Sequence, residues 1–196
     1  MARAAQHADV VVASIYVNPT QFAVGEDFDA YPHDMAGDIT KLEAAGCHAV
    51  FTPTSLYPPG QSVIDPNEHT NHTSSYPPSD PIPAPTFPST ATTTTHETWV
   101  TVEALSRHLC GASRPTFFRG VATVVLKLFH IVEPDVALFG RKDLQQLRVI
   151  EQMITDLDLA VSIIPGDICR EEDGLAMSSR NARLGPEGRR TALGLP

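Results

Sequence analysis

The sequence predicts an α/β protein in which strands and helices alternate around a parallel sheet. Residues 9–17 form a continuous, mostly β-branched run that ends at Asn18-Pro19, which is typical of a strand buried on both faces. Residues 135–139 and 160–164 are two further apolar runs, and a helical pattern lies between them. Strands that alternate with helices favour a parallel sheet, and ligands of such sheets bind beyond the carboxyl ends of the strands.

A capping residue and a glycine delimit a first helix. Asp34 is a preferred N-cap residue, and Gly46 is suited to end a helix. The apolar positions between them recur at helical spacing and are Met35, Ile39, Leu42 and Ala45. Residues 48–51 are then expected to form the next strand.

Two more helices are predicted in the second half of the chain. Residues 120–132 are apolar on nearly every side, which is typical of a buried helix. Asp143 can cap a further helix that precedes the strand at 160–164. The apolar face of that helix consists of Leu144, Leu147, Ile150, Ile154 and Leu157.

Residues 61–97 interrupt this pattern. Nine of the seventeen prolines fall within residues 58–88, residues 61–97 contain no lysine or arginine, and residues 92–95 are all threonine. Such a composition provides few side chains for a core, so we predict a disordered, low-complexity insert.

The composition argues against two classes of partner. The chain carries a formal net charge of -9, so it lacks the basic surface of a nucleic-acid binder and is poorly suited to an anionic membrane. No apolar run is long enough to span a bilayer. Cys47, Cys110 and Cys169 are far apart, which fits isolated, buried thiols in a reducing compartment. We therefore expect a cytoplasmic protein.

Two motifs offer groups that bind phosphate. Residues 140–143 (Gly-Arg-Lys-Asp) open a predicted helix directly after a strand, where backbone N–H groups and the helix dipole attract anions and Lys142 adds a charge. Ser178, Ser179 and Arg180 follow Met177 and supply hydroxyl and guanidinium donors. A surface lysine at a helix start and a polar loop with a helix cap would explain the same residues, so each motif alone leaves both interpretations open.

Two further motifs suit a ligand with a carboxylate. Asn18 and Gln21 follow the first strand, and their amides offer both donors and acceptors. Turn formation by Asn-Pro would explain Asn18 but not Gln21. Arg114 and Arg119 lie at the start of the buried helix, where the dipole disfavours positive charge. An anionic ligand would relieve that conflict, and so would a nearby acidic side chain.

In this order, the motifs resemble those of the pantothenate synthetases (pantoate–β-alanine ligases, AMP-forming). The similar stretches are residues 10–22, 31–59 and 98–184. The resemblance implies a Rossmann-like nucleotidyltransferase domain, incomplete here, formed by residues 1–60 and 98–185, with the insert at 61–97 and the start of a truncated C-terminal region at 186–196. It also implies a homodimer, and a reaction in which ATP activates pantoate as pantoyl adenylate before β-alanine displaces AMP.

The resemblance assigns roles residue by residue. Asn18, Gln21, Arg114 and Gln146 are implied in pantoate binding, and Lys142, Ser178, Ser179 and Arg180 in catalysis. The implied ATP-binding residues are Gly140, Arg141, Lys142, Asp143, Cys169, Met177, Ser178, Ser179 and Arg180. ATP and Mg²⁺ are the implied cofactors, with Asp38 as a metal ligand.

The sequence also departs from the family pattern. The His-x-Gly-His segment is not found among its eight histidines, Phe117 stands where many members carry histidine, and Arg141 where many carry glutamate. We therefore expect little ligase activity from these 196 residues alone. Two other hypotheses remain: an inactive fragment that only binds or dimerises, and a different adenylyl-transferring enzyme of the same fold.

Overall fold

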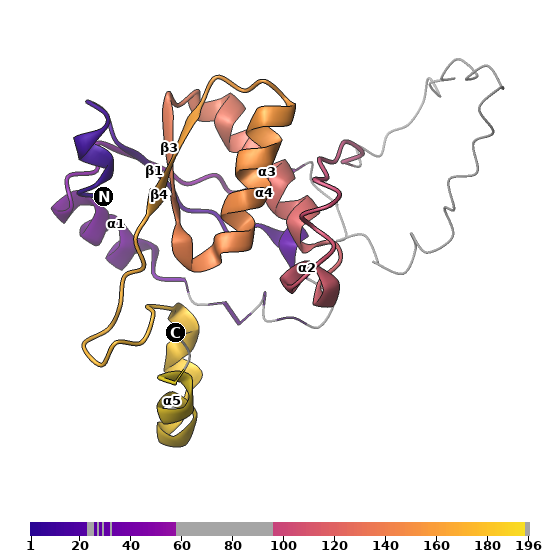
Figure 1. Cartoon of the computed structure of the whole chain (residues 1–196). Coiled ribbons are helices and arrows are strands. Elements are labelled where there is room, and N and C mark those ends of the chain that lie inside the picture. The colour runs from indigo at the N-terminus through magenta and orange to yellow at the C-terminus, as the bar shows by residue number, and fades with distance from the viewer. Residues whose placement is uncertain (23–25, 27, 29, 32, 58–95, 195–196) are drawn as a thin grey trace, which may run out of the picture.

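The computed structural model describes residues 1–22, 26, 28, 30–31, 33–57 and 96–194 (Figure 1). Two pairs of parallel strands form its sheets. Strand β1 (Val12–Ser14) pairs with β2 (Ala49–Phe51), and β3 (Val136–Gly140) pairs with β4 (Ser162–Gly166). The prediction of an α/β protein with parallel strands is thus confirmed. The predicted disordered insert lies outside the described residues except for His96 and Glu97, and its disorder stays a prediction.

Helix α1 (Met35–Ala44) forms as its capping signals predict. The Asp34 carboxylate accepts a hydrogen bond from the Gly37 N–H at 3.0 Å, and Gly46 adopts a positive φ of 78° just after the helix. The next residues extend the β1–β2 pairing, because His48 Nδ1 accepts from the Val11 N–H at 3.0 Å. Helix α1 is therefore a short connection between two paired strands.

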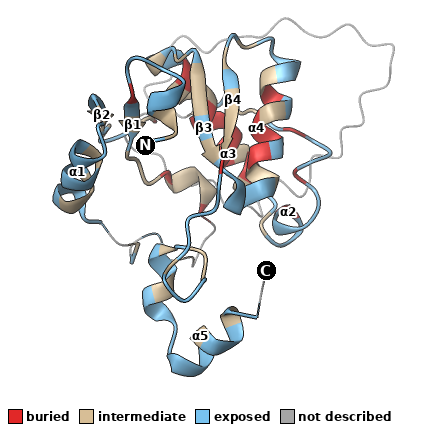
Figure 2. Ribbon diagram, turned by 60° about the vertical axis from the view of Figure 1, so that its left-hand side comes forward, coloured by how far each residue is buried: buried red, intermediate tan, exposed pale blue. Residues whose placement is uncertain are grey.

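The core lies where helices α3 (Phe117–Val132) and α4 (Leu144–Asp156) meet β3 and β4. Buried side chains concentrate on these two helices (Figure 2). The largest fully buried ones are Phe118, Val149, Ile150 and Met153, and Ala137, Phe139 and Ile163 of the strands pack against their cluster. The prediction of a buried helix at 120–132 is confirmed.

Helix α4 buries the central part of the predicted face, but not its two ends. Leu147 and Ile150 are buried as predicted, and Ile154 packs at the core, but Leu144 and Leu157 are 53% and 45% exposed. These two residues lie at the ends of the helix region, beyond the side chains that contact α3. Val149 and Met153 complete the buried face instead. Asp143 precedes the helix without capping it through its side chain.

Short elements connect this framework. They are η1 (Ala4–Gln6), η2 (Pro19–Gln21), α2 (Cys110–Ser113), η3 (Arg141–Asp143), η4 (Ser179–Arg183) and α5 (Pro186–Ala192). Figures 1 and 2 both show α5 apart from the strands, after a long extended connection from β4. The described cysteines are free thiols, and Cys110 and Cys169 are exposed, so the expectation of buried cysteines is wrong for these two. Within the described part of the chain, no helix is both long and apolar enough to cross a membrane.

In the described part of the chain, no strand pairs with the facing edges of β1 and β3, which lie on either side of an apolar groove. Backbone groups of alternate residues in a strand point to opposite neighbours. Val11 and Ile15 bond to β2, so Val12 and Ser14 direct their N–H and C=O groups away from β2; likewise Asp135 bonds to Ser162, so Val136 and Leu138 direct theirs away from β4.

Side chains of β1, β3 and α3 surround a cavity of about 380 Å³ in this groove. It is lined by Val10, Val12, Ser14, Val136, Leu138 and Phe129, among others. Val10 is 64% exposed and Val12 is 42% exposed. The sequence predicted that the strand at residues 9–17 would be buried on both faces. That prediction is wrong for these 196 residues, because no described strand covers the edge of β1 that faces β3.

Hydrogen exchange should reveal the open edge. In the 196-residue protein, the amides of Val12 and Ser14 should exchange faster than those of Ala13 and Ile15, because only the latter two face β2. Residue-resolved exchange measured by NMR provides the comparison within one strand. Equal protection of all four amides would show that the edge is covered.

Candidate functional site

Two polar segments follow the carboxyl ends of strands β1 and β3. Chain segment 15–18 leads from β1 into η2, and η3 begins directly after β3. Because carboxyl ends of parallel strands are where ligands of α/β sheets bind, these segments define the candidate site. Each was predicted from the sequence to follow a strand.

Asn18 is the buried centre of the first segment. Its side chain is only 3% exposed, and its Nδ2 atom donates to the Gly120 carbonyl at 3.1 Å and to Gln21 Oε1 at 3.4 Å. Its Oδ1 atom accepts from the Thr20 hydroxyl at 2.9 Å. All of these bonds are internal, so Asn18 holds η2 on α3 and orients Gln21.

Gly120 makes this contact possible. A Cβ atom at this position would lie 2.4 Å from the Thr20 carbonyl oxygen and 2.9 Å from the Gln21 nitrogen. Backbone atoms cannot give way as a flexible side chain can, so only glycine allows η2 to approach α3 this closely.

Arg114 pairs with an acidic side chain. Its guanidinium donates to both carboxylate oxygens of Glu26, at 2.7 and 2.6 Å, and lies 4.0 Å from the ring centroid of Phe117. It also donates to the Gln21 carbonyl at 3.0 Å. Of the two explanations offered by the sequence, the acidic partner is the one present here, and Arg114 thereby fixes the backbone of Gln21.

The second segment presents cations at the end of β3. Lys142 is half exposed and its Nζ atom lies 3.8 Å from an Asp143 carboxylate oxygen. Arg141 and Arg3 both contact Asp167, at 3.4 and 2.8 Å, at the end of β4. Ion pairs of this exposure hold side chains weakly, so the η3 cations stay accessible to a ligand. Gln146 follows within the first turn of α4 and is partly buried.

A third segment carries the remaining predicted residues. Met177 donates its N–H to the Cys169 carbonyl at 2.9 Å, and Arg170 and Ala176 form an isolated antiparallel bridge, so residues 169–177 make a hairpin. The Ser178 side chain caps η4 by accepting from the Arg180 N–H at 3.3 Å. A polar loop with a helix cap was one of the two interpretations of this motif.

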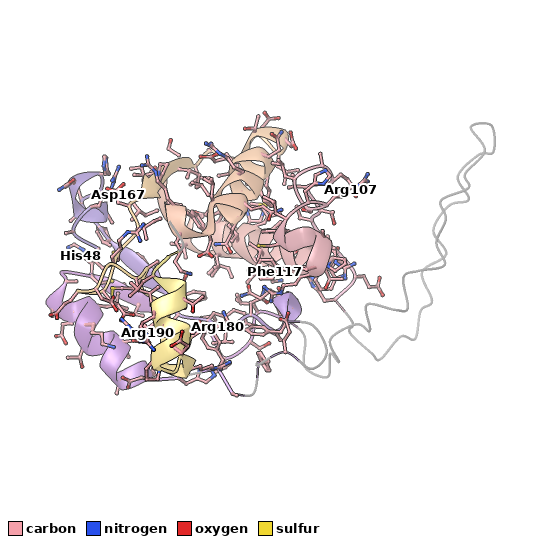
Figure 3. All side chains as sticks on the ribbon, turned by 60° about the horizontal axis from the view of Figure 1, so that its bottom comes forward. His48, Arg107, Phe117, Asp167, Arg180 and Arg190 are labelled. Carbon is pink, nitrogen blue, oxygen red and sulfur yellow. The ribbon has the colours of Figure 1, made fainter. Side chains whose placement is uncertain are left out.

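Element η4 contacts the chain that follows η2. The Arg180 guanidinium lies 5.5 Å from the Tyr31 ring centroid, and Arg183 donates to the Ala30 carbonyl at 3.3 Å. Figure 3 shows Arg180 near α5, and Asp167 far from it beside the N-terminal segment. The structure thus joins Asn18, Gln21 and Arg114 directly, while Lys142 and Arg180 come from two other segments.

An ionic network ties α5 to the hairpin. Arg189 of α5 pairs with Glu171 and Asp173, and Asn181 donates to Glu171 at 2.6 Å. The Asn181 amide and then Arg189 lower the pKa of Glu171, and Arg189 together with the Leu175 N–H lowers the pKa of Asp173. The two carboxylates in turn raise the pKa of Arg189.

Asp38, the predicted metal ligand, lies on the exposed first turn of α1. Its carboxylate is 3.3 Å from Lys41 Nζ. Among the residues that the structure describes, no group of three or more histidine, cysteine or acidic side chains could hold a metal ion.

Sequence reasoning missed the roles that Thr20, Glu26, Tyr57 and Gly120 have in the first segment, where the Tyr57 hydroxyl lies 3.1 Å from Thr20 Oγ1. Thr20 stands within the Asn-Pro-Thr-Gln motif and could have been included from its position. Glu26 and Arg114 are 88 positions apart, and nothing in a single sequence signals that they pair.

Comparison with known proteins identifies the chain as a member of a ligase family. A family model described as Pantoate-beta-alanine ligase matches residues 1–196. The chain therefore belongs to the pantoate-beta-alanine ligase family.

Curated relatives and solved structures agree with this assignment. The chain is 48% identical to a pantoate--beta-alanine ligase of Arabidopsis thaliana, over 95% of the chain and 58% of the relative, and 50% identical to that of Oryza sativa subsp. japonica, over 99% and 59%. It therefore spans about three fifths of these relatives.

Two structures support the fold. A pantothenate synthetase from Thermus thermophilus aligns with a TM-score of 0.76 at 38% identity, over 98% of this chain and 58% of that one. A pantoate-beta-alanine ligase from Francisella tularensis, complexed with beta-gamma ATP and beta-alanine, aligns with a TM-score of 0.71 at 30% identity, over 97% and 61%.

Adding a methyl group at Gly120 should disturb the first segment. Gly120→Ala must displace the Thr20 carbonyl or α3, so we expect a loss of roughly 1–3 kcal/mol in unfolding free energy. Gly185→Ala is the matched control, because its added Cβ would meet no atom within 4 Å. Urea unfolding of both variants measures the effect. Equal unfolding free energies of the two variants would mean that η2 can move away from α3 at no cost.

The attachment of α5 should depend on acid pH. Because the folded-state pKa values of Glu171 and Asp173 are lowered, their contribution is present above their ordinary values of about 4 and is lost as pH falls below them. The protection factors of the α5 amides, taken relative to the intrinsic exchange rate at each pH, should therefore fall on acidification from pH 7 to 3. Arg189→Gln should lower the protection factors already at pH 7, whereas Arg190→Gln, which removes a pair within α5, should not. Protection factors of α5 that stay constant from pH 7 to 3 in the unmodified protein would contradict the assignment.

Proposed function

We propose that this chain carries the pantoate- and ATP-binding part of a ligase that joins pantoate to β-alanine with formation of AMP. The observation that carries the proposal is the Gln21 amide, held by buried Asn18 at the carboxyl end of β1, in a chain of the pantoate-beta-alanine ligase family. A Rossmann-like nucleotidyltransferase domain is the corresponding fold, and the parallel strands with helices between them are consistent with it.

Pantoate is a small acid with a carboxylate and hydroxyl groups, and it needs several donors held in place. Gln21 and Gln146 supply amide groups from segments that follow β1 and β3. Asn18 and Arg114 serve this site indirectly, since their polar atoms bond to Gln21, Gly120 and Glu26. They are positioning residues in this proposal rather than ligands.

ATP would lie across the end of β3. In the first step a pantoate carboxylate oxygen attacks the α-phosphorus, a P–O bond forms, and the bond to the leaving pyrophosphate breaks. Lys142 and the η3 N–H groups neutralise charge that develops on the phosphates. Ser178, Ser179 and Arg180 supply further donors, and Cys169 and Met177 contribute backbone from the hairpin. In the second step the β-alanine amine attacks the acyl carbon and AMP leaves.

Mg²⁺ commonly accompanies ATP in phosphate chemistry, and it would neutralise part of the triphosphate charge. The described residues do not fit a protein-built metal centre, because Asp38 pairs with Lys41 and no described cluster of acidic groups stands ready to share an ion. We therefore assign no step of the reaction to a metal ligand of this chain.

We infer that the active protein holds a further strand in the groove between β1 and β3. The groove is apolar, and on its two sides Val12, Ser14, Val136 and Leu138 direct backbone N–H and C=O groups away from β2 and β4, where an added strand could bond to them. In the complete gene product, with whatever residues flank these 196, the Val12 and Ser14 amides should then be as protected as that of Ala13.

Family membership favours the ligase over the two other hypotheses, the inactive binding or dimerising module and a different adenylyl-transferring enzyme. Release of AMP by the complete gene product, dependent on pantoate, ATP and β-alanine together, would distinguish them. The domain boundaries, the homodimer and the cytoplasmic location stay predictions.

Substitutions at Lys142 and Gln146 should have different kinetic effects, because the proposal places Lys142 at the ATP phosphates and Gln146 at pantoate. In the complete gene product, Lys142→Ala should slow adenylate formation by roughly 10²–10³-fold, because it removes charge that acts mainly in the transition state. Gln146→Ala should raise the KM for pantoate by about tenfold. Single-turnover measurement with pantoate titrated resolves both effects.

Arg148→Ala is the control, since Arg148 is exposed on α4 and pairs with Glu151. It should leave adenylate formation within about twofold. The phosphate assignment is wrong if Lys142→Ala weakens only the affinity for pantoate.

A further inference from the structure

Tyr57 lies next to the first segment of the site although it is remote from it in sequence. It is 7% exposed, and its ring stands 4.9 Å from that of His96 and 6.4 Å from that of Trp99, measured between centroids. Its hydroxyl oxygen lies 3.1 Å from Thr20 Oγ1. Burial raises the pKa of Tyr57 to about 12, so the hydroxyl keeps its proton at physiological pH.

The direction of this hydrogen bond follows from the inventory of hydrogens. A threonine hydroxyl has one hydrogen, and Thr20 gives it to Asn18 Oδ1 at 2.9 Å. Thr20 can therefore only accept from Tyr57. The phenol is the donor that begins a chain of bonds.

The Gly120 carbonyl fixes the orientation of the Asn18 amide. If the amide were flipped, Oδ1 would face the Gly120 carbonyl, and two acceptors would meet without a hydrogen. Nδ2 must therefore face Gly120, and its second hydrogen is the one directed to Gln21 Oε1 at 3.4 Å.

The chain of bonds determines which end of Gln21 remains for a ligand. Since Gln21 Oε1 already accepts from Asn18, the Nε2 group is the part of the amide left to bind. It carries two hydrogens and no acceptor, which suits the oxygens of a carboxylate or hydroxyl.

We propose that Tyr57 is a positioning residue for the acid substrate: through Thr20 and Asn18, its hydroxyl sets Gln21 with the amide N–H groups toward the ligand. This inference rests on the proposed function for the identity of the acid, but the orientation of Gln21 does not depend on it. If Tyr57 served only to pack against His96 and Trp99, its ring alone would matter. A positioning residue acts through its hydroxyl.

The test removes the hydroxyl and keeps the ring. In the complete gene product, Tyr57→Phe should raise the KM for pantoate roughly threefold to tenfold, with kcat and the KM for ATP unchanged. Thr155→Val is the control, because the Thr155 hydroxyl is exposed on α4 and donates to the Glu151 carbonyl at 3.0 Å; it should leave the KM for pantoate unchanged.

Two more variants test the path. Thr20→Ser keeps the hydroxyl and should retain pantoate affinity, while Thr20→Val should match Tyr57→Phe. In a Gln21→Ala background, Tyr57→Phe should cause no additional loss, because the bonds act through Gln21. Equal losses from Tyr57→Phe in both backgrounds would overturn the proposal.

A measurement without ligand separates this inference from the proposed function. The side-chain amide resonances of Gln21 should shift on Tyr57→Phe and not on Thr155→Val. If they shift while the unmodified protein binds no pantoate, the proposed substrate is wrong and the positioning of Gln21 stands. If pantoate binds and neither the resonances nor the KM respond to Tyr57→Phe, the positioning role is wrong.

Discussion

The close approach of η2 to α3 is the constraint on which the candidate site depends. Helix α3 is the most deeply buried element, and a single missing side chain, at Gly120, allows the Thr20 and Gln21 backbone to lie against it. The Asn18 side chain then closes the gap by bonding to the Gly120 carbonyl. A binding residue on a loop would usually share the mobility of that loop. Here Asn18 bonds the loop to α3 and Arg114 bonds to the Gln21 carbonyl, so Gln21 is held against the core on both sides.

Charged groups serve two distinct purposes in this acidic protein. Arg114 and Arg189 each bind two acceptors at close range and hold segments together: η2 with residue 26, and α5 with the hairpin. Lys142 and Arg141, in contrast, make single contacts of 3.8 and 3.4 Å at the end of β3. Breaking such weak ion pairs in order to bind a phosphate costs little free energy. Since the net charge is -9, an anion would meet these cations only at short range, which favours a ligand whose other groups are already bound.

Local signals predicted the elements, and long-range pairing explains what the sequence did not reveal. Asp34 with Gly46 delimited α1, and the all-round apolar run at 120–132 predicted the buried α3, because capping and burial are encoded within a few residues. The exposure of Val10 and Val12 was missed because the pattern of a strand says which faces are apolar but not whether a neighbour covers its edge. The link from Tyr57 to Thr20 spans 37 positions and the link from Glu26 to Arg114 spans 88, so neither follows from spacing along the chain. The candidate site residues came from motifs at strand ends and from the resemblance, and their contacts show that Asn18 and Arg114 bond within the protein.

The groove between β1 and β3 separates the two halves of the site as well as the two sheets. Gln21 is reached from the end of β1 and Lys142 from the end of β3, and the free edges of these strands face each other. Helix α3, packed beneath both, is the structure that now sets their separation. In-line attack on a phosphorus atom requires the reacting atoms to be aligned at about 3–3.5 Å, and an error of about 1 Å is costly. Binding one ligand requires only one half of the site to be rigid, whereas transfer between two ligands requires both halves to be held in register. A strand hydrogen-bonded to both β1 and β3 would provide that register directly, and under the proposed function its presence would affect catalysis more than the affinity for either substrate.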